Sequence, residues 1–270
     1  MLRILVSNDD GINARGIRLL VETILTLPEV EVFVVAPADE KSGVGHSITY
    51  RSALSPTPHP FYGLPVQAWQ VNGTPADCIK SAYHLLFADQ KKPDLVLSGI
   101  NVGNNLGRDV YYSGTCSAAR EAVILGIPAV ALSYDNFFHQ AEFGEAGAIV
   151  QPLLQHFVEQ VKQHQLPLEV FWNVNIPHRK RSEIKGYAPA ILSLYHYEDL
   201  YQREAEGYWL RRQYKDADGD ERDDYHLLTN GYVTVTPIHI DSTDRRLLDE
   251  MARWPLMTGW SGEEKEEKKG

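Results

Sequence analysis

Short apolar runs that alternate with amphipathic stretches constrain the fold of this chain most strongly. In the first 150 residues or so, the runs Leu2–Val6, Glu31–Val35, Asp94–Leu97 and Ala129–Leu132 are typical of buried strands, and helical periodicity separates each from the next. Continuous apolar strands that alternate with helices indicate a parallel sheet that is covered on both faces. The pattern therefore predicts an α/β fold with a Rossmann-like, doubly wound and mostly parallel sheet.

The segments between these strands carry helix signals. The predicted helices are Gly16–Leu25, Pro75–Leu86, Thr115–Leu125 and a long one, Glu142–His164. Thr74 is a candidate N-cap before Pro75, and Thr115 is a candidate for the same role in its own helix. Pro152 falls inside the long helix and predicts a bend there.

The pattern changes after about residue 166. Val170–Val174 is compatible with one more sheet strand, whereas Tyr208–Leu210 and Gly231–Thr236 are typical of antiparallel hairpins, and a final helix is predicted from Thr243. We expect a core over residues 1–180, a hairpin and helix extension over 181–260, and a disordered, charged tail over 261–270. Because exposed strand edges are usually covered, the extension is predicted to mediate oligomerisation.

Composition excludes several classes of function. The 270 residues carry a formal net charge of −10 and contain no basic block, which argues against binding to a DNA or RNA duplex. Cys78 and Cys116 have no partner pattern and are predicted to be free thiols in helices. No apolar stretch approaches the ~20 residues of a membrane span, and acids interrupt the first run too early for a signal peptide. A cytoplasmic protein without a membrane partner is expected.

Polar, glycine-bearing segments follow three of the predicted strands. These segments are Ser7–Gly11, Ala36–His46 and Ser98–Gly107, and Tyr112–Thr115 follows the last of them. In an open parallel sheet such segments meet at the carboxyl edge, where ligands bind. Two carboxylates with amide and hydroxyl oxygens suit Mg²⁺, Mn²⁺ or Ca²⁺, and a helix beginning near Thr115 would direct free amides at a phosphate. Together they favour metal-assisted phosphate ester chemistry, in which the metal activates a water.

Six sequence blocks resemble the survival protein SurE family of nucleotidases. They are Ile4–Ile12, Val35–Pro37 with Ser42–Gly43, Asn72–Asp77, Ser98–Gly107, Tyr112–Thr115 and Gly231–Pro237. The blocks occur in the family's order and cover about residues 2 to 241. The resemblance implies a phosphoric monoester hydrolase, a 5′-nucleotidase that acts on nucleoside 5′-monophosphates, with 3′-monophosphates and short polyphosphate as further candidate substrates.

The resemblance also implies a set of site residues. One divalent cation per subunit, with Mg²⁺ or Mn²⁺ expected, would be held by Asp9, Asp10, Ser42 and Asn101. The phosphate would be bound by Asn105, Ser113, Gly114 and Thr115, and the catalytic residues would be Asp9, Asp10 and Asn105. The family forms homodimers or homotetramers by exchanging carboxy-terminal hairpins and helices, so a homo-oligomer is expected.

Two other functions fit parts of the pattern. A non-catalytic, Mg²⁺-binding phospho-receiver module also places acids after its first strand, but it needs an acceptor Asp after a later strand, where this chain has Ser98-Gly99. A metal hydrolase of another ester is the second alternative. Asp109 and His46 are weak candidates for the acid that protonates the leaving group.

Overall fold

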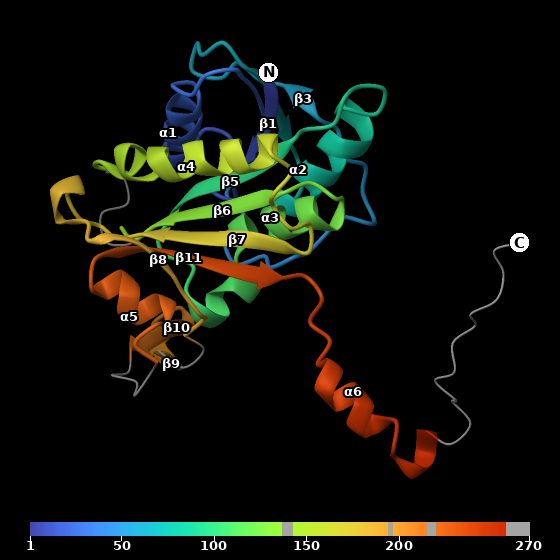
Figure 1. Cartoon of the computed structure of the whole chain (residues 1–270), viewed down its shortest axis with the longest axis vertical. Coiled ribbons are helices and arrows are strands. Elements are labelled where there is room, and N and C mark those ends of the chain that lie inside the picture. Colours follow the sequence, from blue (N-terminus) through green and yellow to red (C-terminus); the bar gives the residue numbers. More distant parts are fainter. Residues whose placement is uncertain (137–142, 194–196, 215–219, 258–270) are drawn as a thin grey trace, which may run out of the picture. The chain divides into compact units, whose positions relative to one another are not determined.

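The computed structural model describes residues 1–136, 143–193, 197–214 and 220–257 (Figure 1). The chain divides into two compact units, Met1–Ile240 and Asp241–Gly270. The first unit contains the sheet and every residue of the candidate site. The described part of the second unit contains the α-helix α6, Arg245–Met251, which Asp244 caps, and a short 3₁₀ turn, η5, over Pro255–Met257.

The first unit is built on a nine-stranded sheet with the order β3-β4-β2-β1-β5-β6-β7-β11-β8. The strands are β1 Leu2–Ser7, β2 Val30–Pro37, β3 Thr57–Pro58, β4 Gln67–Val71, β5 Leu95–Val102, β6 Ala129–Tyr134, β7 Val170–Ile176, β8 Gly186–Pro189 and β11 Tyr232–His239. The six strands from β4 to β7 in this order are mutually parallel. The predicted fold class is confirmed.

Helices cover both faces of this sheet. They are α1 Arg15–Ile24, α2 Pro75–Ser81, α3 Gly114–Ile124, α4 Ala146–Lys162 and α5 Asp224–Thr229, with short turns η1 Ala82–Leu86, η2 Gly107–Tyr111 and η4 Arg181–Glu183. Alternate residues of β1 belong to different cores: Ile4 and Val6 pack in the cluster that includes α1 and α4, and Leu5 packs in the cluster with α2 and α3. Figure 1 shows α1 beside α4. Burial on both faces explains why β1 is a continuous apolar run.

Helix boundaries differ from the sequence prediction in instructive ways. Ser113, not Thr115, is the N-cap of α3, and its hydroxyl accepts a hydrogen bond from the amide of Cys116. The last turn of the predicted Pro75–Leu86 helix is a π-helix, η1. The predicted Glu142–His164 helix corresponds to α4, which ends at Lys162 and contains Pro152. Its first predicted residue, Glu142, lies outside the described residues. Cys78 and Cys116 are free and buried in helices, as predicted.

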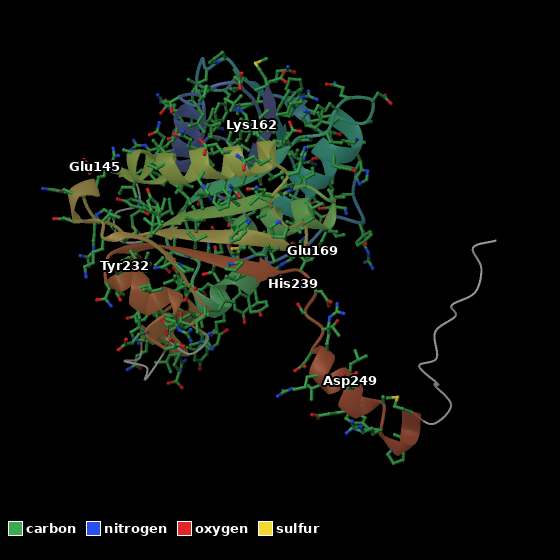
Figure 2. All side chains as sticks on the ribbon, in the orientation of Figure 1. Glu145, Lys162, Glu169, Tyr232, His239 and Asp249 are labelled. Atoms are coloured by element: carbon green, nitrogen blue, oxygen red, sulfur yellow. The ribbon has the colours of Figure 1, made fainter. Side chains whose placement is uncertain are left out.

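The segment from Gly231 to Thr236 does not form the hairpin that was predicted. It belongs to β11, which joins the main sheet antiparallel to β7 and parallel to β8. Figure 2 shows Tyr232 and His239 at opposite ends of this strand. The segment packs within its own chain, because Val233 is fully buried in the main core.

Tyr208–Leu210 does form an antiparallel hairpin. Two strands, β9 Tyr197–Glu204 and β10 Gly207–Tyr214, pair with each other and with no other strand of the described chain. Tyr201 and Tyr208 are exposed at 70% and 69%. Residues 215–219, in the acidic stretch that runs from Asp216 to Asp224, and the predicted tail, 261–270, lie outside the described residues.

Candidate active site

The turn after β1 holds Asp9 at the carboxyl edge of the sheet. The Asn8 side chain donates to the carbonyl oxygen of Gly11 at 2.8 Å, and the amide of Lys41, after β2, donates to the main-chain oxygen of Asp9 at 2.7 Å. Gly11 has a φ of +96°, and a Cβ there would lie 3.3 Å from the carbonyl carbon of Asp39. The turn therefore requires a residue without a side chain at position 11.

Asp9 is buried against the amino end of α3. Its side chain is 3% exposed and accepts hydrogen bonds from the Thr115 hydroxyl and from the backbone amides of Gly114 and Thr115. A Cβ on Gly114 would come within 2.7 Å of the Asp9 Cβ, so this glycine permits the close approach. Burial raises the pKa of Asp9, although the hydrogen bonds from Thr115 and Gly114 oppose the rise.

Asp10 lies beside it and is half-buried. Burial raises its pKa to about 7, the negative charge of Asp9 adds to this rise, and the amide of Val102, 3.4 Å from the carboxylate, opposes it. No Lys, Arg or His among the described residues forms an ion pair with Asp9 or Asp10. Two adjacent carboxylates thus lack a cationic side chain to compensate them, which is the electrostatic environment in which a metal ion is commonly bound.

The two other expected metal ligands come from the segment after β2 and from β5. Ser42, in the segment after β2, is exposed and donates to Glu40 at 2.8 Å. Asn101 lies on β5 opposite Ser133 of β6, and its Nδ2 donates to the carbonyl oxygen of Gly103 at 2.9 Å. That bond uses the amide nitrogen of Asn101, which leaves the side-chain oxygen Oδ1 as the atom available to coordinate a cation.

The donor set fits a hard divalent cation. It consists of carboxylate, hydroxyl and amide oxygens, without sulfur or imidazole, and such oxygens favour Mg²⁺, Mn²⁺ or Ca²⁺. Within the described residues no three His, Cys, Asp or Glu side chains cluster as a metal site. The expected ligand set contains only two such residues, Asp9 and Asp10, because its other members are Ser42 and Asn101.

The expected phosphate-binding residues are also at this edge. Ser113, Gly114 and Thr115 form the start of α3, where free amides and the helix dipole favour an anion. The Ser113 hydroxyl is used as the N-cap, and the Thr115 hydroxyl donates to Asp9. Both hydroxyls therefore already have partners in the protein.

Asn105 is 7% exposed and is held by residues that the sequence analysis did not single out. Its main-chain amide donates to Oδ1 of Asn175 at 2.7 Å, and its side-chain amide donates to the Ser133 hydroxyl at 2.8 Å. Asn173 donates to its carbonyl oxygen at 2.8 Å. A signal was available, since two asparagines at alternate positions of an otherwise apolar strand place two polar groups on one buried face.

The two candidate leaving-group acids are engaged with other residues. His46 Nε2 lies 2.8 Å from Glu121, which also accepts from Lys80 at 2.9 Å. Burial acts to raise the pKa of Glu121, but the hydrogen bonds from His46 and Lys80 outweigh it and lower the pKa. Asp109 accepts a hydrogen bond from the Tyr197 hydroxyl. Neither contact places a proton donor at Asp9 or Asp10.

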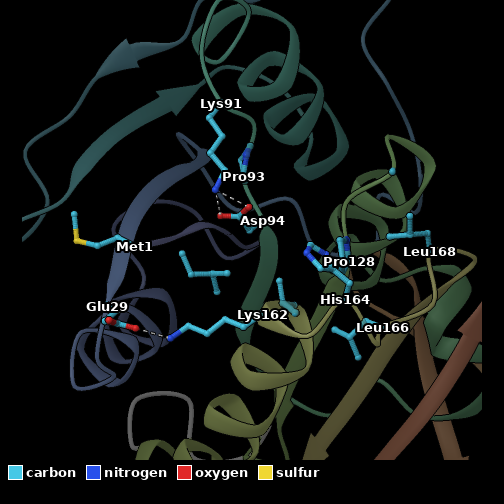
Figure 3. A pocket seen from close by; sticks show the side chains of 13 residues that line it. Met1, Glu29, Lys91, Pro93, Asp94, Pro128, Lys162, His164, Leu166 and Leu168 are labelled. Atoms are coloured by element: carbon cyan, nitrogen blue, oxygen red, sulfur yellow. Dashed lines mark hydrogen bonds and ion pairs between the residues drawn. The ribbon is translucent and has the colours of Figure 1, made fainter.

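A cleft of about 590 Å³ lies at the opposite, amino edge of the sheet (Figure 3). It is lined by residues that include Met1, Lys91, Asp94 and Lys162. Its charges are paired, Lys162 with Glu29 at 2.9 Å and Lys91 with Asp94 at 3.0 Å. Ligands of open parallel sheets bind at the other edge, so we do not assign the chemistry to this cleft.

Comparison with known proteins gives a consistent family. The Survival protein SurE family profile matches residues 4–199. The chain is 60% identical to the 5′-nucleotidase SurE of Brevibacillus brevis, over 97% of this chain and 100% of that protein, and 39% identical to the 5′-nucleotidase SurE of Carboxydothermus hydrogenoformans, over 94% and 96%. The crystal structure of the SurE protein from Aquifex aeolicus aligns with a TM-score of 0.76 at 34% identity, covering 93% of this chain and 98% of that one. The chain belongs to the SurE family.

Proposed function

We propose that this chain is a 5′-nucleotidase that hydrolyses the phosphate monoester of nucleoside 5′-monophosphates with the help of a divalent cation. One observation carries the proposal: at the carboxyl edge, Asp9 is buried against the amino end of α3 and Asp10 is half-buried beside it, and no cationic side chain of the described chain forms an ion pair with either. The names of the relatives from Brevibacillus brevis and Carboxydothermus hydrogenoformans support the same reaction class.

In this proposal one Mg²⁺ or Mn²⁺ per subunit is held by Asp9, Asp10, Ser42 and Asn101. When bound, such a cation supplies Lewis-acid charge to a phosphoryl oxygen and lowers the pKa of a water molecule. Asp9 is kept in place by Thr115 and Gly114, and the orientation of Asn101 is fixed by its bond to Gly103. The protein contributes a preorganised pair of negative charges, which favours binding of the cation.

Asn105, Ser113, Gly114 and Thr115 are proposed to bind the phosphate. The Asn105 amide has a second N–H beyond the one directed at Ser133, and a helix start favours an anion electrostatically. Asp9 and Asp10 are needed as metal ligands, so direct attack by water is simpler than a phospho-aspartate intermediate. Direct attack inverts a chiral, isotopically labelled phosphate ester, whereas net retention or a trapped phospho-Asp9 would contradict it.

A substrate panel tests the proposed activity. Purified protein is incubated with nucleoside 5′- and 3′-monophosphates, short polyphosphate, an aryl phosphate and an acyl ester, each with Mg²⁺, with Mn²⁺ and with chelator. We expect phosphate release from the 5′-monophosphates that depends on added metal. Hydrolysis of the acyl ester alone would identify another ester hydrolase, and metal binding without any hydrolysis would favour a receiver-like role.

Assembly through residues 181–260 is a further part of the proposal. Tyr201 and Tyr208 of the β9–β10 hairpin and Leu247 and Leu248 of α6 are exposed apolar side chains, which monomers rarely leave in large patches. We expect a homodimer or homotetramer by light scattering at micromolar concentration. A monomer under these conditions would contradict this part.

We also propose a cytoplasmic location, because free buried thiols suit a reducing compartment. Among the described residues, no helix combines the length and apolar composition that crossing a bilayer requires.

A further inference from the structure

Strand β7 carries two buried asparagines whose side chains reach the loop between β5 and α3. Asn173 and Asn175 are 0% exposed and alternate with apolar residues in the sequence Val170–Ile176. Because side chains alternate along a strand, both asparagines point to the same face of the sheet. Their partner in the loop is the main chain of Asn105, about seventy residues earlier in the sequence.

The side chain of Asn175 forms hydrogen bonds with both main-chain polar groups of Asn105. Its Oδ1 accepts from the Asn105 amide at 2.7 Å, and its Nδ2 donates to the Asn105 carbonyl oxygen at 3.2 Å. Asn173 donates to the same carbonyl oxygen at 2.8 Å. These contacts satisfy backbone groups that would otherwise be buried without partners, which is unfavourable.

The side chain of Asn105 is fixed separately. Its Nδ2 donates to the hydroxyl of Ser133, on β6, at 2.8 Å, and Ser133 is fully buried. Three polar residues on two adjacent central strands therefore determine both the position and the amide orientation of one residue. Apolar side chains would support these strands at least as well, so the polar choice needs a reason in the loop that they hold.

We propose that Asn175, Asn173 and Ser133 are positioning residues that act through Asn105. They hold its side-chain amide in a fixed direction at the carboxyl edge, so that its second N–H meets the phosphoryl group without reorganisation. This inference rests on the proposed function, because it gives Asn105 a role toward substrate. Besides Asn105, Asn173 contacts helix α3, where the Cys116 thiol donates to its Oδ1 at 3.5 Å.

A double-mutant cycle tests the proposal. Asn175→Ala is expected to lower kcat about 100-fold while KM changes less than about threefold, because a misplaced group loses transition-state contacts first. Asn105→Ala should lower kcat by a similar factor, and the double variant should be no slower than Asn105→Ala alone. Losses that multiply in the double variant would overturn the proposal, since Asn175 would then act independently of Asn105.

Ser133→Ala is a milder second variant, in case Asn175→Ala does not fold. It removes one hydroxyl and should lower kcat about tenfold, with no further loss when combined with Asn105→Ala. Thr234→Val is the matched control. Thr234 lies on β11 directly opposite Asn175, is fully buried, and its hydroxyl has no hydrogen-bond partner in the described chain. Its kcat should equal that of the wild type.

Hydrogen exchange separates this proposal from the proposed function. The main-chain N–H of Asn105 should exchange at least about tenfold faster in Asn175→Ala than in the wild type, while the main-chain N–H groups of β1 keep their protection. If the wild type hydrolyses no phosphomonoester, the proposed function fails, but this exchange measurement still decides the positioning. Unchanged exchange at Asn105, or a destabilised variant with wild-type kcat, would overturn it.

Discussion

The two edges of the same sheet differ in how their charges are compensated. At the carboxyl edge, buried Asp9 and half-buried Asp10 stand side by side and form no ion pair with the described residues. At the amino edge, the cleft of about 590 Å³ is bordered by the ion pairs Lys162–Glu29 and Lys91–Asp94. The charged side chains that line the cleft are paired, and the two carboxylates are not. Uncompensated charge, more than volume, indicates where a cation and its chemistry belong.

Asp9→Asn should have the largest effect on activity. Removing one charge of the pair lowers its affinity for a cation, and we expect phosphatase activity to fall at least about 100-fold. The metal-free fold should survive, since burial already raises the pKa of Asp9 and a neutral amide suits the site. Phosphate release and circular dichroism check both parts. Full activity in the folded variant would contradict the assignment of Asp9.

Gly114→Ala should damage the same edge sterically. The new Cβ would lie 2.7 Å from the Asp9 Cβ and 3.0 Å from the Pro75 side chain, so one of these groups must move. We expect a loss of about 1–3 kcal/mol in the free energy of unfolding, and a reduction of kcat of about 10- to 100-fold. Since Ala in a helix is ordinarily favoured over Gly, a stabilised and fully active variant would show that Gly114 does not have to approach Asp9 closely.

Asp10→Asn should change the pH dependence of stability in chelator. The pKa of Asp10 is about 7 in the folded chain against 3.8 as its ordinary value, so the folded state holds this proton more tightly than the unfolded state. The resulting stabilisation is complete below about pH 4 and is lost as pH rises to about 7, a change of roughly 2–4 kcal/mol. Asn cannot ionise, so the variant should be more stable than the wild type at about pH 8 and similar to it at about pH 4.

Urea unfolding at both pH values measures this difference. The comparison between the two proteins removes the effect of other titrating groups, which they share. A constant difference across the pH range would show that Asp10 does not titrate as its burial indicates.

Lys162→Gln, at the amino edge, should have the smallest effect. It breaks the ion pair with Glu29, which is exposed, and such pairs contribute little to stability. We expect kcat within about twofold of the wild type, because balanced surface charges do not take part in the chemistry. A large loss of kcat would make the cleft part of the active site and would remove the contrast between the two edges.

The sequence predicts the parts of this molecule that depend on local patterns. Buried strands such as Leu2–Val6 and caps such as Thr74 are visible in short windows of sequence, and both are present in the fold. The carboxyl-edge rule then brings Asp9 together with the start of α3, which its hydrogen bond to Thr115 confirms.

Long-range pairings were not visible in the same way. Gly231–Thr236 has the alternation of a half-exposed strand. Its antiparallel partner is β7, which is distant in the sequence, rather than the strand that precedes it in the chain, because tertiary packing overrides the local pattern. Thr115 looked like an N-cap, yet its hydroxyl donates to Asp9 and Ser113 takes that role. Asn173 and Asn175 form hydrogen bonds to Asn105, about seventy residues earlier in the sequence, and no local pattern predicts that partner.

Titration of the metal-free protein with Mn²⁺ by calorimetry tests the central claim most directly, which is that Asp9 and Asp10 form a cation site. The wild type should bind one Mn²⁺ per chain, and neither Asp9→Asn nor Asp10→Asn should bind it at comparable affinity, while Lys162→Gln should bind it as the wild type does. Wild-type affinity in both aspartate variants, or loss of binding in Lys162→Gln, would contradict the account.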